Sequence, residues 1–378
     1  MARKPPSRST PPAPKPAKTQ PAKVAAAAIA ADRALARAVV RWFRTAARDL
    51  PWRRARSGYA ALVSELMLQQ TQVSRVVEKF EPFVDRFPTP AALAAATEDE
   101  VLAAWQGLGY YRRARLLHAA AKACVERHGG EVPTDLASLL ELPGVGRYTA
   151  GAIASIVHGQ PAPIVDGNVA RVLQRVHARE GRSGDRATDA WAWQLAERFA
   201  IAAGRDVAEA NEGLMEIGAT VCAPAAPRCD ACPLAAQCRA RAEDSVGRIP
   251  APKVRAARRE LVLVTARVRR LDGAILLEQR PRGGLWGGLW QPPSIEHPEG
   301  EELAPRAAAR ALGLDLALEP AGTVPFATTH RAVRFVVLDA RVRGRGESLA
   351  TGGRRWVGAD ELASHALSNA AKKVIGKL

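Results

Sequence analysis

The sequence is poor in cysteine, methionine and aromatic residues. It has 5 cysteines and 3 methionines among 378 residues, and Phe, Trp and Tyr together make up 5%. Four of the cysteines cluster at 222–238, which excludes a disulfide framework of the kind that staples small secreted proteins. No run of 18 apolar residues occurs, and the AAAAIAA stretch at 25–31 is too weakly apolar for a secretory signal. We therefore expect a cytoplasmic protein without a membrane partner.

Acidic residues are scarce relative to basic ones. Lys and Arg number 55 against 38 Asp and Glu, which gives a formal net charge of +17 and a pI of about 10.4. Charge of this sign favours a polyanionic partner, most often nucleic acid. The length and the hydrophobic content of 47% suffice for two or three domains with their own cores.

Composition divides the chain into four segments. Residues 1–31 form a basic tail, Pro-rich up to residue 23, which we expect to be disordered because it has little apolar surface to bury. Residues 32–240 predict successive helices broken by Gly and Pro, and 241–259 predict a polar linker. Residues 260–378 predict a small α+β domain with strands at 260–268, 274–280 and 334–342 and helices at 304–312 and 369–378. Asp272-Gly273 predicts that the first two strands form a hairpin.

The stretch SELMLQQTQ at 64–72 places one carboxylate in an otherwise apolar helical turn. Glu65 lies among Leu62, Leu66 and Leu68, and amide side chains follow it. Desolvation by such neighbours raises a carboxyl pKa toward neutrality, where the group can act as a general acid. The alternative is a glutamate on the surface of a helix.

Two further stretches indicate DNA contact and a second carboxylate. The turn LPGVG at 142–146 joins two helical runs, and Gly144 and Gly146 let the backbone approach an anion such as a phosphate. Such a turn is typical of a helix–hairpin–helix, but ordinary helical hairpins also turn on glycine. Asp166, in VDGNVARV at 165–172, precedes another helical run. Alone it reads as an N-cap, whereas its pairing with Glu65 favours a chemical role.

The clustered cysteines indicate a metal centre. The array Cys222-x6-Cys229-x2-Cys232-x5-Cys238 supplies four thiolates, and its uneven spacing leaves both zinc and an iron–sulfur cluster open. The remaining Cys124 is expected in the core. The spacing of His118, His128 and His158 does not suit metal ligands, so structural or exposed positions are expected.

Taken in order, SELMLQQTQV, GLGYYRRAR, LPGVGRYTAGA, IVDGNVARV and the cysteine array resemble the MutY family of adenine DNA glycosylases. The resemblance is close over roughly 45–240 and looser beyond. It implies an all-α, two-lobed helix–hairpin–helix catalytic domain with a 4Fe–4S loop at 222–238, followed by a smaller α+β Nudix-like domain. It also implies a monofunctional, nucleoid-associated monomer that removes adenine mispaired with 8-oxoguanine or guanine in double-stranded DNA.

The resemblance further implies roles for individual residues. Glu65 would protonate the leaving base, and Asp166, helped by Asn168 and Tyr148, would stabilise and transiently bond the sugar. The base must be flipped out of the duplex. The residues implied to contact substrate or DNA are Arg48, Trp52 and Arg53 in the adenine pocket, and Gln70 and Tyr110 as wedges, with Leu108 as their support. Cys222, Cys229, Cys232 and Cys238 would hold the cluster.

Three features bear on alternative functions. Related endonuclease III-type enzymes carry a Schiff-base lysine where this chain has Tyr148 and lack the glutamate at 65, so a bifunctional glycosylase/lyase is the alternative enzyme. A non-catalytic DNA-binding module would need neither carboxylate. After Gly300 the C-terminal domain lacks an acidic RExxEE ladder, so nucleotide hydrolysis is not expected. Thr329 and His330 in PFATTHR (325–331) are the expected oxidised-guanine contacts; a plain turn with a solvent-facing histidine is the alternative.

Overall fold

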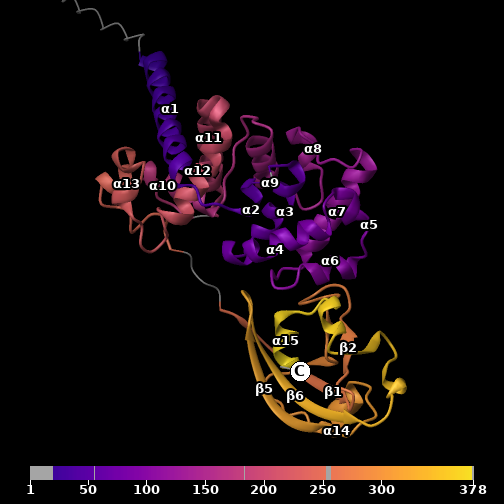
Figure 1. Ribbon diagram of the computed structural model, residues 1–378. Coiled ribbons are helices and arrows are strands. Elements are labelled where there is room, and N and C mark those ends of the chain that lie inside the picture. The colour runs from indigo at the N-terminus through magenta and orange to yellow at the C-terminus, as the bar shows by residue number, and fades with distance from the viewer. Residues whose placement is uncertain (1–19, 55, 183, 253–256, 377–378) are drawn as a thin grey trace, which may run out of the picture.

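The structure, a computed structural model, describes residues 20–54, 56–182, 184–252 and 257–376. A helical part with two lobes comes first, and a smaller part built on a β-sheet packs beneath it (Figure 1). No helix in these ranges is long and apolar enough to cross a bilayer.

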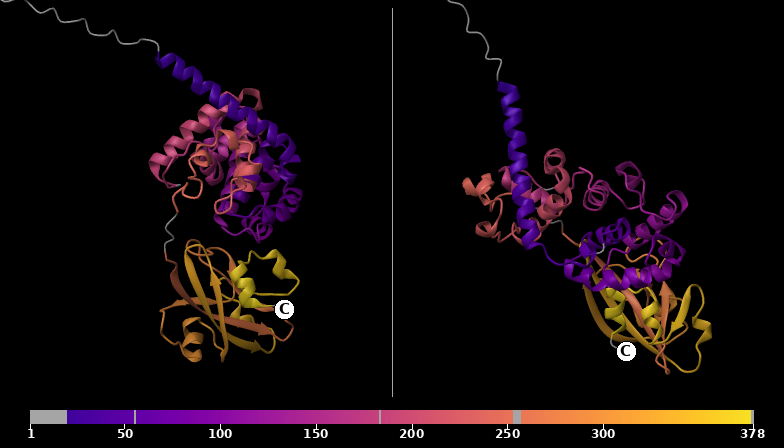
Figure 2. Two further views of the ribbon diagram at one scale, coloured as in Figure 1. Left: turned by 90° about the vertical axis from the view of Figure 1, so that its left-hand side faces the viewer. Right: turned by 45° about the horizontal axis from the view of Figure 1, so that its top comes forward.

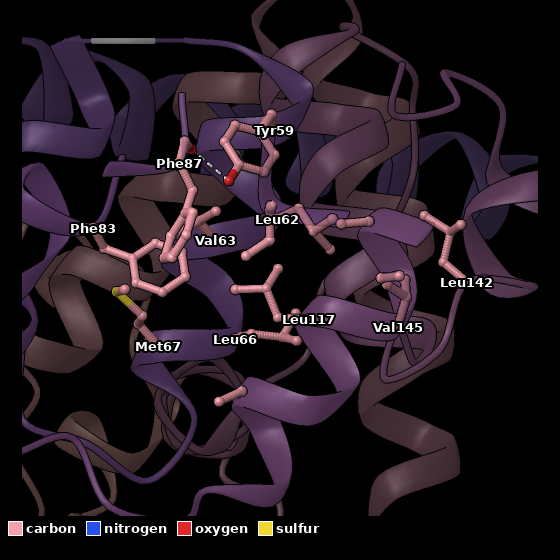
Figure 3. Close-up of a cluster of buried hydrophobic side chains, with 14 of the residues drawn as sticks. Tyr59, Leu62, Val63, Leu66, Met67, Phe83, Phe87, Leu117, Leu142 and Val145 are labelled. Atoms are coloured by element: carbon pink, nitrogen blue, oxygen red, sulfur yellow. Dashed lines mark hydrogen bonds between the residues drawn. The ribbon is translucent and has the colours of Figure 1, made fainter. Parts of the chain in front are cut away.

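The first lobe surrounds α3, a helix that is buried along most of its length because nearly all of its residues are apolar. Its core contains Leu62, Leu66 and Met67 of α3, and the Tyr59 hydroxyl donates to the Phe87 carbonyl at 2.7 Å (Figure 3). The elements of this lobe are α2 (Pro51–Arg54), α3 (Gly58–Leu68), α4 (Val73–Arg86), α5 (Pro90–Ala95), α6 (Glu98–Ala104), α7 (Arg112–Arg127), α8 (Leu136–Leu140), α9 (Arg147–Ala152) and the π-helical turn η1 (Ile153–Val157).

The second lobe joins the N-terminal helix to the helices that follow Asp166. Val39, Leu173 and Leu214 share its core, which brings α1, α10 and α12 together. Its elements are α1 (Gln20–Ala46), α10 (Gly167–Val176), α11 (Arg186–Ala203), η2 (Gly204–Asp206), α12 (Val207–Thr220), and three short helices around the cysteines, η3 (Cys229–Ala231), η4 (Ala235–Gln237) and α13 (Arg239–Ala242).

The predicted tail is too long at its C-terminal end. We assigned residues 1–31 to a disordered tail, but α1 begins at Gln20 and projects from the lobe (Figures 1 and 2). The stretch AAAAIAA at 25–31 consists almost entirely of the residue with the highest helix propensity, which favours a helix at these positions. Residues 1–19 lie outside the described residues.

The C-terminal part is the predicted α+β domain. Its sheet has the order β3-β2-β1-β6-β5, with β4 also paired to β1 and β7 to β2; β1 and β6 run parallel and β1 and β2 form the predicted hairpin. Alternate residues of β1 face opposite helices: Val264 packs toward α14 and Leu263 toward α15. The elements are β1 (Arg259–Arg270), β2 (Ile275–Gln279), β3 (Trp290–Gln291), β4 (Ser294–His297), α14 (Pro305–Ala311), β5 (Glu319–Ala327), β6 (Arg331–Val342), η5 (Glu347–Leu349), β7 (Arg354–Val357), η6 (Glu361–Ser364) and α15 (Asn369–Ile375).

The C-terminal domain docks on the first lobe through α6 and α7. Leu289 and Ala366 are fully buried within the first lobe's core cluster. The Tyr111 hydroxyl donates to the Leu367 carbonyl at 2.8 Å, and Arg115 donates to the Gly287 carbonyl at 2.9 Å. The contact therefore combines apolar burial with hydrogen bonds to backbone of the smaller domain.

Candidate active site

A cavity of about 420 Å³ lies between the two lobes. This volume falls in the range of pockets that hold small ligands. The segment before α3, the end of α3, α9 with η1, the start of α10, and α12 contribute its walls. Of the predicted site residues, the cavity brings together Glu65, Asp166, Asn168, Tyr148, Arg48, Trp52, Arg53 and Gln70.

Glu65 enters the cavity from the last turns of α3. Its side chain is buried, with 8% of the residue exposed, and its Oε2 atom has no hydrogen-bond partner among the described residues. Burial raises its pKa to about 7, and repulsion from Asp166 adds to the rise, while the nearby Tyr148 hydroxyl opposes it. Glu65 is therefore a carboxyl that exchanges its proton near neutral pH.

Asp166 is both an N-cap and a wall of the cavity. Its Oδ1 accepts the Val169 amide at 2.7 Å, and its Oδ2 accepts the Asn168 side-chain amide at 3.0 Å. Burial raises the pKa of Asp166, and these hydrogen bonds with the Arg171 charge hold the rise in check. Asp166 is thus an N-cap and also a carboxylate of the cavity, and the capping hydrogen bond fixes its orientation.

Asn168 is fixed in turn by Arg171 and Gly218. The Arg171 guanidinium donates to Asn168 Oδ1 at 2.9 Å and to the Gly218 carbonyl at 2.8 Å. A Cβ atom at Gly218 would lie 2.5 Å from Asn168 Cβ, so only glycine permits this approach of α12 to α10. Arg171 also donates to the Cys222 carbonyl at 2.8 Å, which connects the acidic wall with the cysteine loop.

Tyr148 lies on α9 beside Glu65. Its hydroxyl donates to the Met215 sulfur at 3.1 Å, and burial, together with the charges of Glu65 and Asp166, raises its pKa. The hydroxyl is thus neutral and can donate to one acceptor at a time. No lysine is among the described residues that line the cavity.

Another wall of the cavity pairs arginines that precede α3 with glutamates of α12; the sequence predicted Arg48 and Arg53 here but not Glu212 and Glu216. Glu216, 1% exposed, accepts from Arg48 Nε at 2.6 Å and from Arg53 at 3.0 Å. Glu212 accepts from Arg53 at 2.9 Å and from Arg56 at 2.7 Å. Burial acts to raise the pKa of Glu216, but the two arginines outweigh it and hold the pKa below its usual value.

The two predicted wedge residues lie in strained turns. Gln70 follows the end of α3 at φ +56°, and Tyr110 precedes α7 at φ +46°, a region that favours glycine. Both side chains are exposed, and only Gln70 lines the cavity. Leu108 is 4% exposed and belongs to the core, so it supports the Tyr110 turn from within and presents no surface to DNA.

The C-terminal domain reaches this region at the turn between β5 and β6. Thr329 and His330 are exposed there, and the Thr329 hydroxyl lies 2.5 Å from the Tyr110 hydroxyl. The turn therefore adjoins Tyr110, one of the two predicted wedge residues, although neither Thr329 nor His330 lines the cavity.

The two glycines of the predicted hairpin differ. Gly144 has φ +80°, and a Cβ atom there would lie 2.7 Å from Leu116 Cβ, so the turn requires glycine. Gly146 is the N-cap of α9 in an extended conformation with open space around it. Neither glycine lines the cavity.

The four clustered cysteines line one small cavity of about 20 Å³ in the second lobe. In the described part of the chain, no three His, Cys, Asp or Glu side chains are close enough to share a single metal ion. Arg175 donates to Cys222 Sγ at 3.4 Å and to the Ala223 carbonyl at 2.7 Å. Cys124, as predicted, is buried in the core, as is His118, while His128 and His158 are half-buried.

Comparisons with known proteins agree with this architecture. Residues 63–198 match the HhH-GPD superfamily of base excision DNA repair proteins, and residues 264–377 match the NUDIX domain. The adenine DNA glycosylase of Homo sapiens is 34% identical over 89% of this chain and 72% of that protein, and that of Mycobacterium tuberculosis is 44% identical over 52% and 64%. A thermostable thymine-DNA glycosylase structure superposes with a TM-score of 0.51 at 27% identity, over 57% of this chain and 99% of that one.

The fold, the paired carboxylates and these matches define a DNA glycosylase of base-excision repair. The relationship to the human enzyme extends over most of both chains and includes the Nudix-type domain. The chain belongs to the MutY family of adenine DNA glycosylases, as its motifs predicted.

Proposed function

We propose that the protein hydrolyses the N-glycosidic bond of adenine paired with 8-oxoguanine or guanine in duplex DNA, with Glu65 as the acid. The observation that carries the proposal is the pair of unlike carboxyls in one cavity. Glu65 has a pKa of about 7 and no partner on Oε2, whereas Asp166 accepts two hydrogen bonds that oppose the rise of its pKa by burial. Two carboxyls with separated pKa values are the general requirement of glycoside hydrolysis.

In the proposed reaction, the protonated Glu65 donates to the flipped adenine as the C1′–N bond breaks. The deoxyribose gains positive charge, and an Asp166 oxygen opposes that charge and bonds C1′ transiently. Glu65, now anionic, takes a proton from water as the water oxygen replaces Asp166 at C1′. The base leaves with its proton, Glu65 is protonated again, and Asp166 is free. Asn168 keeps the Asp166 oxygens oriented throughout.

The arginine–glutamate wall supports adenine as the base that enters. Arg48 and Arg53 are held by Glu216, and Glu212 adds a carboxylate to the same wall. Such a wall offers donors and an acceptor to the polar edge of a purine, while the Trp52 side chain, packed edge-to-face against Phe80 at 5.7 Å, supplies apolar surface. A neutral adenine buried here would need partners along its polar edge, and this wall carries groups that can supply them.

One experiment tests this function against a pure binding module. A duplex with adenine opposite 8-oxoguanine is incubated with the protein and then heated in alkali. We expect a strand break at the adenine and none at adenine paired with thymine. Binding without any break would contradict the proposal and favour the module.

A second experiment tests it against the glycosylase/lyase. A lyase needs an amine that attacks the sugar, and position 148 carries a tyrosine hydroxyl. We expect little covalent adduct with DNA in borohydride and no strand break in neutral buffer. Abundant trapped adduct would favour the lyase.

We also propose that Cys222, Cys229, Cys232 and Cys238 hold a 4Fe–4S cluster. In such a cluster each cysteine ligates a different iron, so its four sulfurs stand farther apart than around a single zinc ion. All four cysteines line one cavity, which supports a shared centre. Bound there, the cluster would cross-link the loop; four thiolate ligands leave no open position for substrate.

Metal analysis of anaerobically purified protein tests the cluster. In the native protein we expect about four irons and four sulfides per chain. In Cys232→Ser we expect the iron and sulfide to be lost and the affinity for DNA to fall. Cys124→Ala is the matched control, since Cys124 lies in the other lobe, and it should retain the iron. One zinc and no iron in the native protein would refute the cluster.

We further propose that the β5–β6 turn recognises the oxidised guanine. The Thr329–Tyr110 contact places this turn beside one wedge residue, which supports the assignment. Thr329→Val and His330→Ala should reduce the preference for 8-oxoguanine over guanine in single-turnover rates while leaving the adenine:guanine rate nearly unchanged. An unchanged preference would support a plain turn instead.

A further inference from the structure

Arg113 is a buried arginine without a carboxylate partner. It lies on α7 with 6% of its surface exposed, and no ion pair to it occurs within the described ranges. Its five hydrogen bonds go to four backbone carbonyls and one hydroxyl, and none goes to an anion. Burial accordingly lowers the pKa of Arg113 to about 10. A buried cation of this kind costs stability unless its donors are well satisfied.

The acceptors of Arg113 belong to two separate segments of the chain. Nη1 donates to the Leu66 and Met67 carbonyls at 2.7 Å each, at the end of α3. Nη2 donates to Thr71 Oγ1 at 2.9 Å in the turn that follows, and to the Leu108 and Gly109 carbonyls at 3.0 and 3.1 Å in the other turn. One planar guanidinium thus joins the turn that carries Gln70 to the turn that carries Tyr110.

Additional contacts tighten the same junction. Thr71 Oγ1 also donates to the Leu108 carbonyl at 3.1 Å, directly between the two turns. The Tyr110 ring centroid lies 5.5 Å from the Arg113 guanidinium carbon. Both turns hold a non-glycine residue at positive φ, which persists only where surrounding contacts over-determine it.

We propose that Arg113 is a positioning residue that holds Gln70 and Tyr110 at a set separation, so that both side chains enter the duplex together when the adenine is extruded. The inference rests on the proposed wedge roles of these two residues. We call this set of Arg113 hydrogen bonds the clamp. Because Arg113 also donates to the carbonyl of Leu66, the residue after Glu65, the clamp fixes the position of Glu65 relative to Gln70 and Tyr110. Through the Tyr110–Thr329 contact it extends to the C-terminal domain.

Base extrusion and duplex binding are measured separately to test the clamp. In Arg113→Lys the charge stays, but one ammonium cannot reach both turns with the same set of bonds. With 2-aminopurine in place of adenine opposite 8-oxoguanine, we expect the fluorescence rise on binding to slow by about tenfold or more. Affinity for a duplex with an abasic-site analogue, where no base needs extrusion, should change by less than about threefold.

Controls separate positioning from folding. Arg127→Lys removes an arginine from the far end of α7 that touches neither turn, and it should extrude normally. Thr71→Val removes single hydroxyl contacts with Arg113 and Leu108, and it should slow extrusion by a smaller factor. This milder variant decides the question if Arg113→Lys does not fold. Equal loss of extrusion and of abasic-site affinity in the folded variants would make Arg113 merely structural and overturn the proposal.

A double-mutant cycle shows whether Arg113 acts through the wedges. In a Gln70→Ala/Tyr110→Ala background, Arg113→Lys should add almost nothing to the slowing of extrusion. Full additivity would overturn the clamp. If Gln70→Ala and Tyr110→Ala extrude adenine normally, the proposed wedge roles are wrong. If these two variants are impaired but Arg113→Lys extrudes normally, the wedge roles stand and the role of Arg113 is wrong.

Discussion

Glu65 on α3 and Glu216 on α12 face the same cavity and are both buried, yet they behave as opposites. Glu65 has apolar neighbours and an unpartnered Oε2, and its pKa rises to about 7. Glu216 is even less exposed, but Arg48 and Arg53 surround it and hold its pKa low. Burial alone therefore does not produce an acid catalyst; the absence of a cation beside the carboxyl does. Glu65 can therefore donate a proton near neutral pH, whereas Glu216 stays ionised and holds Arg48 and Arg53 in place.

The largest effect is expected from a variant of Glu65 that cannot donate a proton. Glu65→Gln keeps the shape but has no acidic proton, so single-turnover adenine release should fall at least about a hundredfold. Binding to the mispaired duplex should persist. Glu126→Gln, an exposed change on α7, is the control and should cleave normally. Release above a tenth of the native rate would reject the assignment.

Glu216→Gln tests the arginine–glutamate wall. It leaves Arg48 and Arg53 without their shared anion, so stability at pH 7 should fall by about 3 kcal/mol in urea unfolding. Because the folded-state pKa of Glu216 is depressed, the lost stabilisation is present above the ordinary glutamate pKa and vanishes as the pH falls through the folded-state value. The difference from the native protein should thus shrink in acid. The exposed Glu197→Gln should change stability by less than about 0.5 kcal/mol.

The pH dependence of the native enzyme should show the same contrast. The acid form of Glu65 is present below its pKa of about 7, so adenine release should fall about tenfold per pH unit above that value. A decline on the acidic side should follow protonation of Asp166, whose pKa is also raised by burial. A single-turnover rate that stays flat from pH 7 to 9 would contradict the role of Glu65.

The smallest expected effect is a gain in stability. Ionised Glu65 destabilises the fold, and its cost begins above the ordinary glutamate pKa and reaches its full size above pH 7. Glu65→Gln removes that cost, so it should stabilise the protein by about 1–2 kcal/mol at pH 8 and not at pH 4. Equal stability changes at both pH values would show that ionisation is not involved.

Local sequence was sufficient for some of these features and not for others. Glu65 was found because three leucines flank it in a single helix, and Asp166 because a helix start follows it. Glu216 was missed because a glutamate in EGLMEIG looks like the polar face of an ordinary helix. Its partner Arg48 is 168 residues away, and the Tyr110–Thr329 contact joins residues 219 apart. Such contacts are decided by packing of distant elements, which no local pattern records.

Local sequence also predicted some secondary-structure elements correctly and misplaced the boundary of another. The β1–β2 hairpin and the strand at 331–342 follow from alternating apolar residues and the Asp272-Gly273 turn. The start of α1 differs from the predicted boundary because the alanine run at 25–31, which lacks charge and aromatics, resembles a tail in composition. The helix propensity of alanine acts locally, whereas a domain boundary drawn from apolar patterning includes only residues that are expected to have a buried face.

The burial of Leu289 and Ala366 in the first lobe has a consequence for biosynthesis. Translation produces α3 to α9 long before these two residues exist, although both belong to that lobe's core cluster. Until residue 366 has emerged, the side of α6 and α7 that receives the C-terminal domain presents apolar surface to solvent. A nascent chain whose first lobe folds before that point exposes this surface, and exposed apolar surface of this kind is what chaperones bind.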